Sequence, residues 1–212
     1  MTAMVRKTET MSDFIEVWPS AFGGKNWMPM SFDPQRRVAY FNTINLGMKI
    51  KYVKQPRPQQ PTWYLGLELG GFAAPEDGMR GSLVAWDPAT GKKVWEVPSK
   101  APNWSGVVST GGGVVFTGAQ TGEFMAFDAD SGAKLWQFQT GSGIIGQPTT
   151  YRGPDGRQYV AILSGVGGWA GAVVSGDLDV RDGTAALGFV NVMRDLKDVT
   201  TKGGTLYVFR LP

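Results

Sequence analysis

The sequence contains no cysteine and no histidine in its 212 residues. Their absence excludes Ser–His and Cys–His nucleophilic catalysis, zinc sites built on those ligands, and haem attachment through a Cys-x-x-Cys-His motif. It also removes disulfides as an indicator of the redox compartment. Any chemistry must therefore come from a carboxylate, a lysine, a tyrosine or a bound cofactor.

Long apolar runs and a strong charge imbalance are also missing. No apolar run approaches the roughly 18 residues that a membrane-spanning helix requires, and residues 1–14 lack the apolar segment of a secretory signal. The 21 basic and 18 acidic residues give a net charge of +3 without a dense block, so we expect no nucleic-acid partner. A hydrophobic fraction of 42% and 30 glycines indicate a globular protein rich in turns.

Two segments of the chain repeat each other 41 residues apart. Ala85–Trp95 reads AWDPATGKKVW and Ala126–Trp136 reads AFDADSGAKLW, which share the pattern A-x-D-x-x-x-G-x-K-x-W. Gly91 and Gly132 occupy turn positions where a positive φ favours glycine. Each copy is therefore predicted to be a β-hairpin, although two unrelated hairpins with similar turns would give the same pattern.

A tryptophan that recurs with a period of about 40 residues is typical of a β-propeller. We therefore assign Trp95 and Trp136 to packing between blades. The fold class is predicted as all-β, a partial propeller of about three four-stranded blades. Because three blades cannot close a ring, we expect a chain that assembles with others or a piece of a longer protein, and the polar start favours the piece.

The rest of the chain is less regular. Arg37–Thr43 and Gly204–Leu211 read as strands, and Arg152–Arg157 as a hairpin turn. Asn45–Gly71 is predicted to be a long surface loop, because it contains three prolines. A short helical turn is predicted around Asn191–Leu196.

Three tryptophan segments are candidates for a binding site. Asn26 and Trp27 lie in GGKNW, where an amide beside an indole suits a flat ligand with polar edges. Trp104 lies in PNWSG and Trp169 in GVGGWAG. Packing tryptophans and a turn-capping asparagine would explain the same residues. A phosphate site at GVGG is not predicted, because we expect no helix to follow it.

Together these motifs resemble the pyrroloquinoline quinone (PQQ)-dependent alcohol dehydrogenases of the methanol/ethanol dehydrogenase family. The segments GGKNWMPMSFDP, WSGVV, GSGIIGQPTTYRGPDGRQYVA and SGVGGWAG occur in the order of that family's landmarks. The resemblance covers about residues 17–212 and corresponds to the C-terminal part of an eight-bladed propeller with tryptophan-docking motifs. Residues 1–16 are expected to be a polar tail or the edge of a fragment.

The resemblance also implies roles for single residues. It makes Asn26 and Trp27 contacts of PQQ, and Trp104 part of the wall of the cofactor chamber. Trp169 would lie over the substrate side, with Val166 and Gly168 in the same turn.

The family's metal ligands and catalytic aspartate lie upstream of the matched region. We therefore expect no catalytic residue and no metal ligand in this chain, although the family uses Ca²⁺ or a lanthanide. The implied function is part of a periplasmic enzyme that oxidises a small primary alcohol and passes electrons to cytochrome c. The alternative is a non-catalytic propeller scaffold for protein–protein contacts.

Overall fold

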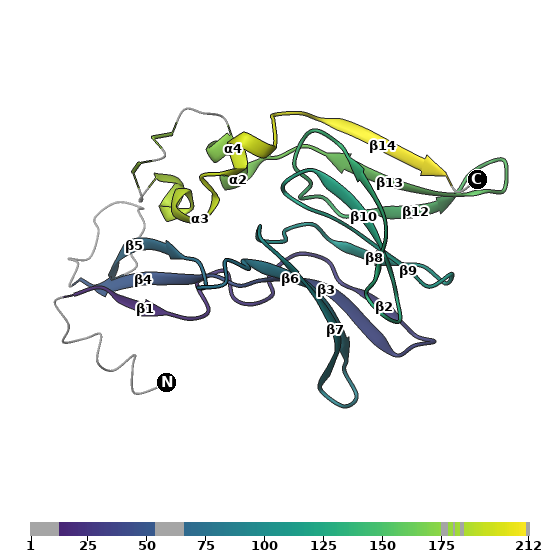
Figure 1. Ribbon diagram of the computed structural model, residues 1–212, viewed down its shortest axis with the longest axis horizontal. Coiled ribbons are helices and arrows are strands. Elements are labelled where there is room, and N and C mark those ends of the chain that lie inside the picture. Colours follow the sequence, from purple (N-terminus) through teal and green to yellow (C-terminus); the bar gives the residue numbers. More distant parts are fainter. Residues whose placement is uncertain (1–12, 54–65, 175–177, 180, 183–184, 211–212) are drawn as a thin grey trace.

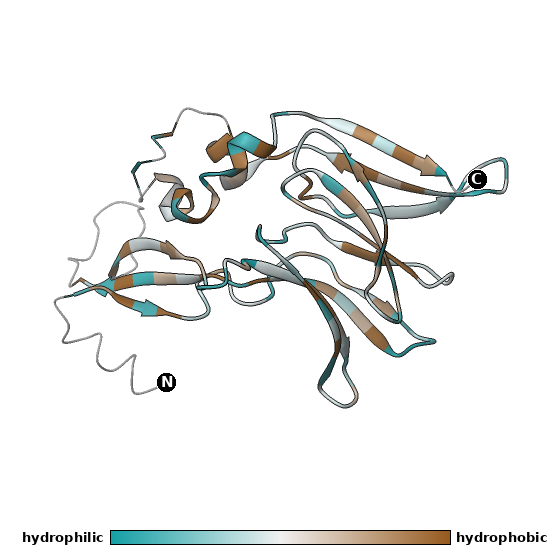
Figure 2. Cartoon of the chain, viewed as in Figure 1, coloured by the Kyte–Doolittle hydropathy of each residue, from teal (hydrophilic) through white to brown (hydrophobic). Residues whose placement is uncertain are grey.

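The computed structural model describes residues 13–53, 66–174, 178–179, 181–182 and 185–210. The described residues form four antiparallel sheets and a few short helices (Figure 1). Apolar residues are found along the strands and in the helices (Figure 2). The chain is therefore an all-β protein, as the sequence predicts.

Two of the sheets have four strands each. The first sheet has the order β2-β3-β6-β7, and the second has the order β11-β10-β9-β8. The repeated segments form the hairpins β6–β7 and β10–β11. The strands are β2 (Ser31–Asp33), β3 (Val38–Ile44), β6 (Gly81–Asp87), β7 (Lys92–Ser99), β8 (Val107–Ser109), β9 (Val114–Gly118), β10 (Glu123–Asp128) and β11 (Lys134–Gln139).

The two repeated hairpins use the same turn chemistry. Asp87 accepts hydrogen bonds from the backbone N–H groups of the following turn, and Asp128 does the same in the second copy. Gly91 has a φ of +67° and Gly132 a φ of +71°. Since these bonds are local, the pattern of Asp and Gly specifies the turn without help from the rest of the fold.

The third sheet has the order β12-β13-β14, with strands β12 (Thr149–Arg152), β13 (Gln158–Ser164) and β14 (Thr205–Arg210). Among the described residues this sheet has three strands where a complete blade has four, and the predicted partial propeller of about three blades is confirmed. The fold is a partial β-propeller in which these three sheets pack on one another in sequence order. One core cluster joins the first and second sheets, and another joins the second and third. Their buried members are Tyr40, Leu83, Ala85, Val107, Val115, Phe127 and Ala129 in one cluster, and Phe124, Ile144, Val160 and Ile162 in the other.

A side sheet of β1 (Ile15–Val17), β4 (Gly47–Tyr52) and β5 (Leu67–Ala73) is formed by the chain between β3 and β6, which pair with each other in the first sheet. The prediction of a surface loop over Asn45–Gly71 is therefore wrong at both of its ends. Met48 and Ile50 contribute to a core while Lys51 pairs with Glu68, which is the alternation of a strand. The three prolines of this segment lie in residues 54–65, outside the described residues. β1 lies partly within the predicted polar tail.

Short helices follow the third sheet's second strand. They are α2 (Gly168–Val174), the 3₁₀ helix η1 (Ala185–Gly188), α3 (Val190–Met193) and α4 (Leu196–Val199). α3 and α4 confirm the predicted helical turn. α2 corrects the expectation that no helix follows GVGG. Ala170 and Val173 of α2 are each 1% exposed, because they belong to the core cluster that also contains Phe22, Trp104 and Phe189.

Candidate functional site

The candidate site is built on the irregular loop 22–29, which lies between the first and second sheets. The backbone N–H of Ile44, at the end of β3, donates to the carbonyl of Gly24 at 2.8 Å. The N–H of Val107, at the start of β8, donates to the carbonyl of Pro29 at 3.0 Å. Both ends of the loop are therefore tied to strands, and the residues between them are held by their own side chains.

Trp27 and Trp104 come together although 77 positions separate them. Their ring centroids lie 6.5 Å apart with planes 24° from parallel. Trp27 is 65% exposed and Trp104 is 6% exposed, so one tryptophan presents a face to solvent and the other lies beneath it. Two of the predicted site segments, GGKNW and PNWSG, thus form one aromatic surface.

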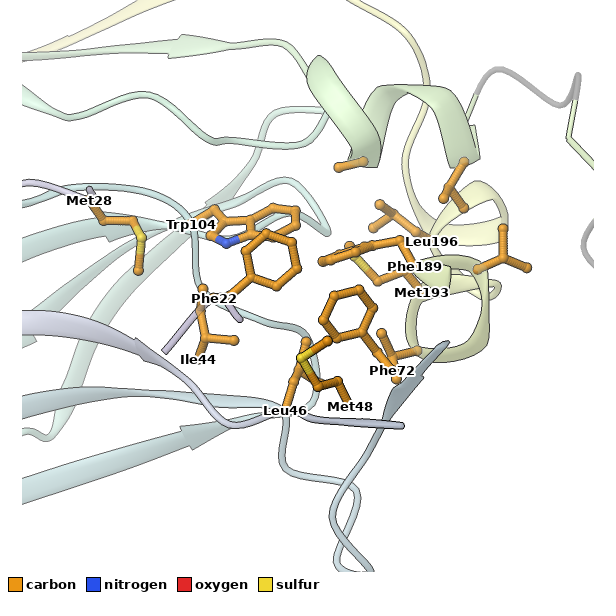
Figure 3. Packing of buried hydrophobic residues seen from close by; sticks show 14 residues of the cluster. Phe22, Met28, Ile44, Leu46, Met48, Phe72, Trp104, Phe189, Met193 and Leu196 are labelled. Atoms are coloured by element: carbon orange, nitrogen blue, oxygen red, sulfur yellow. The ribbon is translucent and has the colours of Figure 1, made fainter. Parts of the chain in front are cut away.

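Trp104 continues into the largest core cluster (Figure 3). Its ring stacks on Phe189 at 4.8 Å and meets Phe22 edge-on at 5.8 Å, and Phe72 stacks on Phe22 at 4.9 Å. Aromatic pairs in these geometries add to the stabilisation that burial alone provides. The position of Trp104 is therefore fixed by the core, and Trp27 is the ring of the pair whose face is open to solvent.

Asn26 uses its side-chain amide to shape the loop. Its Nδ2 donates to the carbonyl of Phe22 at 2.9 Å, and its Oδ1 accepts the N–H of Trp27 at 2.8 Å. The amide has two N–H donors and two acceptor lone pairs, so each atom retains capacity for one more bond. Lys25 lies beside it and donates to the carbonyls of Asn26, at 2.8 Å, and Met28. Burial lowers the pKa of Lys25 from its ordinary value.

Two buried polar atoms next to the aromatic pair lack a partner among the described residues. They are Nε1 of Trp104 and Oδ1 of the preceding residue, Asn103, which is 5% exposed. A buried donor or acceptor without a hydrogen bond costs about 1–3 kcal/mol. Such atoms identify places where a bound group with its own donors and acceptors would be stabilised.

The remaining predicted residues lie on the segment leading into α2. Val166 packs, partly buried, against the same core cluster as Trp104. Gly168 begins α2 with a φ of +58°, a conformation that glycine adopts without strain. The backbone of Trp169 lies in α2, and its side chain is outside the described part of the structure.

The sequence did not predict a role in the site for four residues, which are Phe22, Lys25, Asn103 and Phe189. For Asn103 a signal was present, because the dipeptide Asn-Trp occurs twice, at 26–27 and at 103–104, and the structure brings both copies together. Lys25 and Phe189 carry no such signal. Their roles depend on which carbonyls and rings the folded chain places beside them.

The described residues contain no group of three or more Asp or Glu side chains that could hold a metal ion. The helices among them are all too short to cross a membrane. The chemistry that this part of the site offers is therefore an exposed indole face, an amide with spare capacity and two unpaired polar atoms. These are groups that bind and orient a flat polar ligand.

Comparison with known proteins assigns the chain to a family. The family model described as "Outer membrane protein assembly factor BamB" matches residues 79–186, which include both repeats. Lanthanide-dependent methanol dehydrogenase of Methylacidiphilum fumariolicum is 40% identical over 210 residues, covering 97% of this chain and 34% of that protein. Quinoprotein ethanol dehydrogenase of Pseudomonas putida is 37% identical over 204 residues, covering 96% and 30%. The chain belongs to the quinoprotein alcohol dehydrogenase family.

A solved structure of the family has the same fold. The europium-containing methanol dehydrogenase superposes with a TM-score of 0.84 and 40% identity, over 93% of this chain and 35% of that one. The chain thus spans about a third of the length of the curated quinoprotein dehydrogenases it matches. The sequence prediction of a partial quinoprotein propeller is confirmed.

Proposed function

We propose that this chain supplies part of the cofactor chamber of a PQQ-dependent alcohol dehydrogenase, an enzyme that oxidises a primary alcohol of the methanol/ethanol class to the aldehyde. The observation that supports this most is the Trp27–Trp104 pair. A flat quinone needs an aromatic face that is both rigid and accessible, and Trp27 is 65% exposed while backed by a buried ring.

The polar atoms around the pair fit the same ligand. Nε1 of Trp104 is a donor without a partner among the described residues, and PQQ carries carbonyl and carboxylate oxygens that accept such a bond. The unused N–H of Asn26 is a second donor of the same kind. The redox chemistry would be supplied by bound PQQ, as the acceptor of the hydride that carries the two electrons of the alcohol. This chain's residues bind and orient it, and none of them is proposed as a catalytic base.

Val166, Gly168 and Trp169 are proposed to line the substrate side of the chamber. In support of this, Val166 packs against the cluster that holds Trp104, and Ala170 of α2 is a buried member of that cluster. The α2 segment and the aromatic pair therefore share one rigid support.

The remaining parts of the catalytic centre are proposed to lie outside this chain. A Ca²⁺ or lanthanide ion would polarise the quinone and would be held by residues of the rest of a complete enzyme. The names of two relatives, a lanthanide-dependent methanol dehydrogenase and the "methanol dehydrogenase [cytochrome c] subunit 1" of Paracoccus denitrificans, support a lanthanide and a cytochrome c acceptor. A periplasmic location follows from the resemblance.

Titration of the purified chain with PQQ, followed by tryptophan fluorescence, tests the proposal. We expect saturable quenching that is reduced in Trp27→Ala. We also expect no oxidation of methanol or ethanol by the chain alone with PQQ, Ca²⁺ or a lanthanide, and an artificial electron acceptor. Quenching that does not saturate and is the same in Trp27→Ala would rule out the binding role. Turnover by the chain alone would show that the catalytic centre does not depend on residues outside this chain.

A second candidate is a scaffold that binds no PQQ, which the description of the matching family model favours. A scaffold needs the docked tryptophans Trp95 and Trp136 but has no use for the exposed face of Trp27. The same titration separates the two candidates, because a scaffold gives no saturable quenching.

A further inference from the structure

Lys25 differs from an exposed lysine in its burial and in its hydrogen-bond partners. Its side chain is partly buried, and its ammonium donates to the backbone carbonyls of Asn26 and Met28. These carbonyls belong to the residues on either side of Trp27. Within the part of the chain that the structure describes, Lys25 forms no ion pair with an acidic side chain.

Partial burial of a lysine without a counter-charge costs free energy, because the charged form loses hydration. A lysine at this position could extend into water at little cost, since lysine side chains are long and flexible. The lowered pKa of Lys25 has the same origin in burial. The compensation is the pair of charge-assisted hydrogen bonds to the two carbonyls, which are stronger than bonds between neutral groups.

The two carbonyls that bind Lys25 constrain the backbone of Trp27. Loop 22–29 contains no helix or strand, and the backbone groups of Asn26, Trp27 and Met28 are bonded by the side chains of Lys25 and Asn26. Asn26 ties the start of Trp27 through the bond from the Trp27 N–H. Lys25 gathers the carbonyls before and after it, which leaves the backbone of Trp27 little freedom to turn its indole away from Trp104.

We propose that Lys25 is a positioning residue that holds Asn26 and Trp27 in the orientation that a flat ligand requires. The inference rests on the proposed function only for the identity of that ligand as PQQ. The role of Lys25 in fixing the aromatic pair does not depend on it.

The test uses the full chain and three substitutions at one position. Lys25→Met keeps the length of the stem and removes the donors, Lys25→Arg restores donors, and Lys25→Gln is a smaller polar replacement in case the methionine variant fails to fold. Lys92→Met, on an exposed residue at the start of β7, is the matched control. Near-ultraviolet circular dichroism reports the packing of the Trp27–Trp104 pair. The contribution of the pair to the spectrum is the difference between the spectra of wild type and Trp27→Phe.

We expect Lys25→Met to lose the signal of the pair, and Lys92→Met to keep it. In a Trp27→Phe background, Lys25→Met should cause no further change, because the pair is already absent. PQQ affinity should fall by about tenfold or more in Lys25→Met and recover in Lys25→Arg, in line with the loss of charge-assisted hydrogen bonds. The midpoint of thermal unfolding should stay close to that of Lys92→Met.

Two results would overturn the inference: an unchanged signal of the aromatic pair in both Lys25→Met and Lys25→Gln, or a loss of signal that appears equally in the Trp27→Phe background. If wild type does not bind PQQ but Lys25→Met still loses the signal of the pair, the proposed function fails and the positioning role stands.

Discussion

The indole of Trp95, on β7 of the first sheet, lies against Gly132 in the hairpin turn of the second sheet. A Cβ atom at Gly132 would lie 2.8 Å from atoms of the Trp95 ring, closer than side-chain atoms approach one another. The same indole donates from Nε1 to the carbonyl of Ala129 at 3.0 Å, and the hydroxyl of Tyr40 donates to that carbonyl at 3.0 Å. The tryptophan of one repeat therefore docks on the turn of the next.

This contact predicts that two equivalent glycines respond differently to alanine. Gly91 and Gly132 have nearly the same positive φ, but an added Cβ at Gly91 meets nothing within 4 Å. Gly91→Ala should cost about 1 kcal/mol of unfolding free energy from backbone strain alone. Gly132→Ala should cost about 1–3 kcal/mol more, because its methyl group displaces Trp95. Urea denaturation of both variants measures the difference, and equal costs would refute docking on Gly132.

A second link between the sheets predicts a loss of stability in acid. Arg36 donates to both carboxyl oxygens of Asp130, at 2.7 and 3.0 Å, and to Asp33 at 3.0 Å. The Arg36 guanidinium lowers the pKa of Asp130, and the pKa of Asp33 is lowered first by the backbone N–H of Arg36. A carboxyl whose pKa is lowered by folding stabilises the protein at pH values above its unfolded-state pKa of about 4. This contribution is lost as the pH falls through the folded-state pKa.

We therefore expect the stability of wild type to decline below about pH 4. Asp130→Asn should be less stable at neutral pH and should show a shallower decline, because one of the linked carboxyls is gone. Thermal unfolding midpoints measured at intervals from neutral pH into acid give both slopes. Identical slopes in the two proteins would show that the Arg36–Asp130 pair does not contribute.

Substitution of Trp27 is predicted to weaken ligand binding, whereas substitution of Trp136 is predicted to lower stability. Trp136 is 39% exposed and packs on Phe209 of β14 at 5.1 Å, whereas Trp27 is 65% exposed. Trp27→Ala should lower PQQ affinity by about tenfold, consistent with the loss of one aromatic contact, and change the unfolding midpoint little. Trp136→Ala should lower the unfolding midpoint and leave PQQ affinity unchanged. The reverse outcome would place the binding surface elsewhere.

Packing of the short helices depends on Phe189, which is fully buried and stacks on Trp104 in the core cluster. Phe189→Ala should cost about 3–5 kcal/mol of unfolding free energy, since it removes a large ring from the core. Val199→Ala, at the end of α4 where the valine is 51% exposed, should change the free energy of unfolding by less than about 0.5 kcal/mol. Guanidinium denaturation measures both. A cost for Phe189→Ala near that of the control would mean that the helices are not anchored through this ring.

Local patterns could be read directly from the sequence. The turns with Asp87 and Gly91, and with Asp128 and Gly132, depend on hydrogen bonds and backbone angles within a few residues, so the repeat predicted them correctly. The packing role of Trp95 followed from its recurrence. The alternation of β4, around Met48 and Ile50, was also present but was overlooked because the prolines that follow favoured a loop.

In the candidate site, too, the sequence determined some features and the tertiary structure decided others. Composition determined that the chain has no histidine or cysteine chemistry, and the motifs predicted Asn26, Trp27 and Trp104 as candidate binding residues, whose ligand stays a prediction. Only the tertiary structure decided that Trp27 and Trp104 stack and that Phe189 supports them. It also decided that the carbonyls of Asn26 and Met28 converge on Lys25. Contacts between distant residues depend on the packing of whole sheets and helices, which no short segment encodes by itself.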